Sequence, residues 1–138
     1  MFTINEDEIN QWSANEITAE SLLPDLIRRL IYSLVPQERI KHIHFPSYKA
    51  THHGGYDGEL DTKAPTIFSD TLSSAWEISV RKDIVTKANS DYKTRTEDSE
   101  GKSKKDVTLV VINGRSWPNK AKWIKEKREE NKWADVRA

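Results

Sequence analysis

The sequence predicts a single α/β domain whose mixed sheet carries helices on both faces. Three stretches indicate this fold class. Residues 22–34 repeat leucine and isoleucine at helical spacing, and residues 75–80 alternate apolar and polar side chains. Residues 107–112 form a nearly continuous apolar run, which is typical of a buried parallel strand. A chain of 138 residues suits one domain around one core.

Composition narrows the classes of function. Lys+Arg and Asp+Glu each number 22, so any attraction to nucleic acid must come from local patches. The absence of cysteine excludes disulfides and thiolate metal sites, and four histidines argue against a zinc site. The N-terminus is acidic, and no apolar run approaches the length of a bilayer. We therefore expect a soluble cytoplasmic protein without a membrane partner.

The helices are predicted from periodicity and from end signals. A short helix is expected within residues 5–17, where Ser13–Glu16 has capping-box spacing. The next helix should begin within Ser21–Pro24, because proline is tolerated only in a first turn, and Pro36 should end it. Further helices are expected over residues 82–96 and 119–131.

The strands are predicted at residues 39–45, 58–61, 75–80, 107–112 and 133–137. A turn-rich connection over residues 61–74 makes the second and third strands an antiparallel hairpin. The strand–helix–strand unit that follows should be parallel, which gives a mixed sheet.

The sequence also predicts the limits of the domain and the nature of one loop. Residues 1–20 are expected to form a polar, partly helical extension, and residues 21–138 the domain itself. The last strand meets the end of the sequence without a cap, as in a domain excised from a longer protein. His52 and His53 lie in the loop 46–56, where neighbouring side chains point apart, so we interpret them as plain loop residues.

Two acids are the strongest candidates for chemistry. Asp57 lies in a glycine turn before the second strand, and Glu77 lies on the polar face of the third. Two carboxylates that face one another repel unless a cation lies between them, and Mg²⁺ is commonly held in this way. Such an ion activates water for phosphodiester cleavage. Alternatively, Asp57 is an ordinary turn residue and Glu77 pairs with a lysine.

The element order, with an acid before the second strand and Glu77 in the third, resembles the PD-(D/E)xK nuclease superfamily in its Mrr-like branch. More narrowly, the chain resembles the N-terminal nuclease-like domain of bacterial antiviral proteins built on a STAND-type NTPase. The stretches that carry this likeness are Leu23–Ile31, Gly55–Gly58, Trp76–Ser79, Lys87–Thr96, Arg115–Trp117 and Trp133–Arg137.

The resemblance implies a restriction-endonuclease-like αβββαβ core with flanking helices. It also implies an Mg²⁺- or Mn²⁺-dependent endonuclease that cuts double-stranded DNA as part of a larger NTPase-containing defence protein. Because the net charge is zero, we expect weak DNA affinity that oligomerisation would raise. Asp57 and Glu77 would bind the metal, and Ile78 would lend a backbone carbonyl.

The third member of the motif departs from the family. A lysine should follow two residues after the glutamate, and Ser79 stands there. Lys87 on the next helix is the best substitute, although it could simply pair with Asp83 or Asp91. Ser79 could still bind the attacking water or a phosphate. The missing lysine supports a rival interpretation, a catalytically inactive interaction or DNA-binding domain of the same fold.

Other polar residues are weaker candidates. Asp25 or Glu20 could add a metal contact, but a helix-capping role fits them better. Glu59 is expected to point away from Asp57, and Arg115 could hold phosphate. We expect the tryptophans to belong to the core. The lysines that could touch a DNA backbone, if they are not ordinary solvated surface, are Lys102, Lys104, Lys105, Lys120, Lys122 and Lys125.

Overall fold

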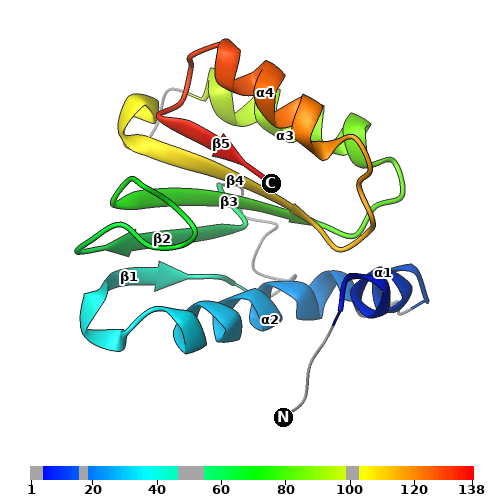
Figure 1. Ribbon diagram of the computed structural model, residues 1–138, viewed down its shortest axis with the longest axis horizontal. Helices are drawn as coiled ribbons and strands as arrows, with labels where there is room; N and C mark the ends of the chain where they lie inside the picture. The colour runs from blue at the N-terminus through cyan, green and yellow to red at the C-terminus, as the bar shows by residue number, and fades with distance from the viewer. Residues whose placement is uncertain (1–4, 16–18, 47–54, 99–102) are drawn as a thin grey trace.

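The computed structural model describes residues 5–15, 19–46, 55–98 and 103–138, excluding the side chains of residues 13–15 and 21. These residues form a single α/β domain with a five-stranded mixed sheet and four α-helices, as predicted. In Figure 1 the helices α1 and α2 lie on one side of the sheet, and α3 and α4 lie on the other. Among the described residues, no helix has the length and apolar character needed to cross a bilayer.

Helix α1 (Glu6–Asn15) confirms the predicted short helix, but its cap differs from the prediction. Asn5 is the capping residue, since its Oδ1 accepts a hydrogen bond from the Glu8 backbone N–H at 2.8 Å. The Asn5 amide also donates to the Glu8 carboxylate at 3.2 Å. Ser13, which the capping-box spacing had singled out, lies inside this helix instead of starting one.

Helix α2 (Ala19–Leu34) begins earlier than predicted, so that Pro24 lies inside the helix and not in its first turn. A proline there has no N–H to donate to the helix ladder. Burial of the apolar face, which includes Leu23, Ile27 and Ile31, favours the continuous helix in spite of that loss.

The sheet has the strand order β1-β2-β3-β4-β5 and confirms the predicted hairpin and parallel unit. Its first two pairings are antiparallel and its last two are parallel. The bounds are Ile40–His44 for β1, Gly58–Thr62 for β2, Ser73–Ser79 for β3, Val107–Asn113 for β4 and Asp135–Arg137 for β5. The helices α3 (Ile84–Glu97) and α4 (Lys120–Glu129) and short 3₁₀ turns at Gln37–Arg39 and Lys104–Asp106 complete the elements.

A hydrophobic core lies on each face of the sheet. Helix α2 packs with Phe45, Leu60 and Trp76, while α3 and α4 pack with Leu109 and Val111. Three tryptophans are buried in these cores and a fourth, Trp117, packs against one of them, as expected. The predicted alternation of β3 is confirmed, because Trp76 faces the α2 core while Ala75, two residues before Glu77, belongs to the α3 and α4 core. Glu77 and Ser79 therefore point toward α3.

Candidate active site

Asp57 and Glu77 lie together where β2 begins beside β3. The Asp57 carboxylate accepts a hydrogen bond from the Ile78 backbone N–H at 2.8 Å. In return, the Asp57 backbone N–H donates to Glu77 Oε2 at 3.4 Å. The N–H and C=O of one strand residue point to the same side, so the Ile78 carbonyl also faces this edge. The structure thus brings together the three residues proposed to hold a metal.

Glu77 is 2% exposed, and its electrostatics are unusual. Burial raises its pKa to about 8, and the neighbouring Asp57 charge adds to the rise. The guanidinium of Arg95 acts in the opposite direction, since Arg95 Nε donates to Glu77 Oε1. A neighbouring carboxylate and a guanidinium therefore act in opposite directions on the buried Glu77 carboxyl.

Arg95 also belongs to this cluster, although it was not among the residues predicted from the sequence. Besides Glu77, its guanidinium donates to the Gly55 carbonyl and lies over the Tyr56 ring, 5.2 Å from the centroid. It therefore ties α3 both to β3 and to the segment that carries Asp57. A signal was present in the sequence, because Lys87, Asp91 and Arg95 repeat at four-residue spacing and so share one helix face.

Lys87 makes one of its two alternative ion pairs. Its Nζ lies 2.7 Å from Asp91 Oδ1, and 28% of the lysine side chain is exposed. Burial raises the pKa of Asp91, Lys87 opposes that rise, and the charge of Asp57 adds to it. Lys87, Asp91 and Ser79 line the same narrow crevice at the carboxyl ends of β3 and β4. Lys87 thus borders the same crevice as Ser79, the residue two positions after Glu77.

Ser79 and Asp25 have local partners. Ser79 is 7% exposed, and its Oγ accepts a hydrogen bond from the Arg81 backbone N–H at 3.0 Å. Asp25 pairs with Arg28 at 2.6 Å and lies well inside α2, so its predicted capping role is wrong. Glu20 does lie in the first turn of that helix.

The expectation that Glu59 points away from Asp57 is also wrong. Glu59 pairs with Ala75 across the hairpin, so its side chain lies on the same face of the sheet as Glu77. Residues two apart on a strand share a face, so the alternation itself places Glu59 on the side of Asp57. The Glu59 carboxylate lies 3.5 Å from the His42 ring nitrogen.

The candidate DNA-contacting side chains are only partly free. Arg115 donates through Nε to the Val80 carbonyl at 2.8 Å. Lys104 donates to the Asp98 carbonyl and lies 5.9 Å from the Trp133 ring centroid, and Lys105 donates to the Asn131 carbonyl. Three lysines of α4, Lys120, Lys122 and Lys125, are exposed, and Lys122 lies 4.0 Å from the Glu126 carboxylate. Outside the described residues lie Lys102, His52 and His53.

The chemistry of the donor set fits Mg²⁺. No group of three or more His, Asp or Glu side chains is arranged to hold a metal among the described residues. Mg²⁺, however, is usually held by one or two carboxylates, with waters and substrate phosphates completing its shell. Besides burial, the charge of Asp57 raises the pKa of Glu77, and a cation held between the two carboxylates would offset that repulsion.

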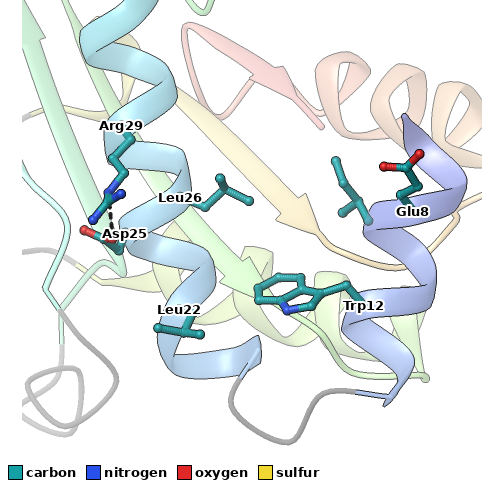
Figure 2. Close-up of a pocket in the computed structure, with 7 residues that line it drawn as sticks. Glu8, Trp12, Leu22, Asp25, Leu26 and Arg29 are labelled. Carbon is teal, nitrogen blue, oxygen red and sulfur yellow. Dashed lines mark ion pairs between the residues drawn. The ribbon is translucent and has the colours of Figure 1, made fainter. Parts of the chain in front are cut away.

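A separate apolar hollow of about 430 Å³ lies between α1 and α2. Figure 2 shows Trp12, Leu22 and Leu26 around this space, with the Asp25–Arg29 ion pair at its side. Its two acids, Glu8 and Asp25, come from different helices, and Asp25 is neutralised by arginine. This hollow therefore carries no arrangement of reactive groups.

Fold and site together define a single α/β domain with two interlocked acids and a partly buried arginine of α3. Comparison of the chain with family models, with curated proteins and with solved structures finds no match.

Proposed function

We propose that the chain is an Mg²⁺-dependent DNA endonuclease domain of the PD-(D/E)xK type. The observation that carries the proposal is the interlocking of Asp57 and Glu77 beside the Ile78 backbone. The motif resemblance and the αβββαβ element order, which suits a restriction-endonuclease-like core, add support. By the same resemblance, the domain is the effector part of a larger bacterial antiviral protein that contains an NTPase.

Each residue of the cluster has a role in this reaction. Asp57 and Glu77, with the Ile78 carbonyl, would hold Mg²⁺ or Mn²⁺, which supplies Lewis acidity and an activated water when bound. Lys87 places a positive charge beside Ser79, where it can neutralise the scissile phosphate or orient the water. Asp91 holds the Lys87 amine in that place through its 2.7 Å ion pair.

The proposed substrate is double-stranded DNA, and the isolated domain should bind it weakly. The net charge is zero, so contacts to phosphate depend on local groups such as Lys120, Lys122 and Lys125. Oligomerisation of a longer chain would place several domains on one DNA and raise their effective concentration.

A clustered form of the chain tests the proposal. The 138-residue chain, fused to an oligomeric scaffold, is incubated with plasmid and Mg²⁺ or Mn²⁺. Asp57→Ala and Glu77→Ala should each abolish cleavage, and Lys87→Ala should slow it roughly 10²-fold or more. Lys93→Ala, an exposed lysine of the same helix, serves as the matched control and should cut like the parent. Cleavage that survives Asp57→Ala or Glu77→Ala in folded protein would overturn the site.

One observation favours a second candidate, a catalytically inactive interaction or DNA-binding domain of the same fold. Glu77 already has a cationic partner in Arg95, and Ser79 replaces the motif lysine. In that case the clustered chain would bind DNA without cutting it at any metal concentration, and binding would be indifferent to Asp57→Ala.

A further inference from the structure

Arg95 is anchored at three points around the candidate site. Its Nε donates to the Glu77 carboxylate, its Nη2 donates to the Gly55 carbonyl, and its guanidinium lies over the Tyr56 ring. Both side chains of this pair are well shielded, with exposures of 17% for Arg95 and 2% for Glu77. Little water screens the charges, so the attraction is strong and alternative partners for Glu77 are few.

The position of Arg95 conflicts with simultaneous metal binding. Glu77 Oε1 accepts the hydrogen bond from Arg95, and Glu77 Oε2 receives the Asp57 N–H at 3.4 Å. A divalent cation held by Asp57 and Glu77 needs lone pairs of that same carboxylate. A guanidinium in contact with it would also repel the cation across a poorly solvated gap. Lys87 is not in this conflict, because its amine is paired with Asp91.

We propose that Arg95 is a positioning residue that holds Glu77 in the metal-free site and competes with the divalent cation for its carboxylate. Metal binding then releases Arg95 from Glu77. The contacts to Gly55 and Tyr56 do not involve the metal ligands, so they keep the guanidinium beside the site. There it can face a phosphate oxygen, for which its planar fork is suited. The inference rests on the proposed function for the identity of the metal ligands.

Manganese binding measures this competition without any nuclease assay. The 138-residue chain is titrated with Mn²⁺, and free Mn²⁺ is followed by electron paramagnetic resonance. Arg95→Gln should bind Mn²⁺ about tenfold more tightly than the parent, or better, because the competing charge is gone. Arg81→Gln, which removes an exposed arginine paired with Asp83, should bind like the parent. Adding Glu77→Gln to Arg95→Gln should abolish the gain.

Thermal unfolding supplies a second readout. Without metal, Arg95→Gln should unfold at a lower temperature, since it leaves Glu77 buried without its guanidinium. Mn²⁺ should then raise the unfolding temperature of Arg95→Gln more than that of the parent. Arg95→Lys, which keeps a charge but loses the fork, gives the same comparison if Arg95→Gln does not fold.

The outcomes separate the two proposals. Equal or weaker Mn²⁺ binding by the Arg95 variants would overturn the competition while leaving the proposed metal site in place. Mn²⁺ binding to neither the parent nor the Arg95 variants would overturn both. Tighter binding that depends on Glu77 supports both.

Discussion

Individual side chains in this protein are held by buried polar contacts. The Glu77–Arg95 ion pair joins β3 to α3 with little access to water. Removing one partner of such a pair costs about 3–5 kcal/mol, mainly because the other charge stays buried. Glu77→Ala and Arg95→Ala are therefore expected to weaken the fold as well as the site. For this reason, the activity and metal-binding tests need a check that each variant is folded.

Tyr92 gives a pH prediction that is independent of the site. Burial raises its pKa to about 12, and the nearby Glu130 carboxylate adds to the rise. A raised pKa in the folded state means that the folded protein holds its proton longer than the unfolded chain, whose tyrosine ionises near pH 10. The free energy of unfolding should therefore fall by roughly 2 kcal/mol as the pH rises from 10 to 12. Denaturant titrations across this range measure the loss.

Two variants isolate the contribution of Tyr92. Tyr92→Phe cannot ionise, so it should show a shallower alkaline loss than the parent. Tyr32→Phe changes a tyrosine that is 45% exposed and should leave the pH dependence as it was. An identical alkaline loss in Tyr92→Phe would contradict the prediction.

At the scale of elements, the start of β2 is set by a close contact between Gly58 and Phe45. A Cβ at Gly58 would lie 2.2 Å from the Phe45 ring, which is far inside normal contact distance. That ring is buried and packs edge-on against Trp76 with centroids 5.5 Å apart. The contact therefore determines how closely the backbone of β2, next to Asp57, packs against Phe45 in the core beneath α2.

Gly58→Ala is expected to destabilise the domain by about 1–3 kcal/mol, the usual range for overpacking a core. The free energy of unfolding from denaturant titration measures the effect. In the double variant Gly58→Ala with Phe45→Leu, the smaller side chain at position 45 should restore part of the lost free energy of unfolding. If Gly58→Ala had no effect, or if the double variant simply added the two losses, the contact would not be the cause.

Helix α3 shows which contacts helical periodicity can predict and which it cannot. Ala88 and Tyr92 are buried, and Lys87, Asp91 and Arg95 follow one edge of that buried stripe. The spacing was sufficient to predict the Lys87–Asp91 pair as one alternative. It did not predict the Arg95–Glu77 pair, because that contact joins a helix to a strand 18 residues earlier.

At the scale of the whole molecule, one sheet serves two cores. Trp76 belongs to the core beneath α2, and Trp123 and Trp133 belong to the core beneath α3 and α4. Strands β3 and β4 contribute side chains to both, so loss of either core removes support from the other. Cooperative unfolding follows from this sharing.

We therefore expect a single two-state unfolding transition. Far-UV circular dichroism and tryptophan fluorescence should give the same midpoint in a denaturant titration. Trp76→Phe and Trp123→Phe, which remove probes from opposite cores, should each keep the two signals coincident. Separate midpoints for the two probes in either variant would show that the cores unfold independently.

Local pattern was enough to predict the element order, the mixed sheet and the faces of β3, because periodicity along a segment encodes its element type and buried side. It failed at the start of α2, where burial of the apolar face against the sheet favours an earlier beginning than the local pattern predicts. The cap at Asn5 and the face of Glu59 depend on local contacts and alternation, and there the prediction itself was wrong. Tertiary packing also places Arg95 beside Glu77. Arg95 contacts the Gly55 carbonyl, which lies 40 residues earlier in the sequence, and only the packing of α3 over the sheet brings the two together.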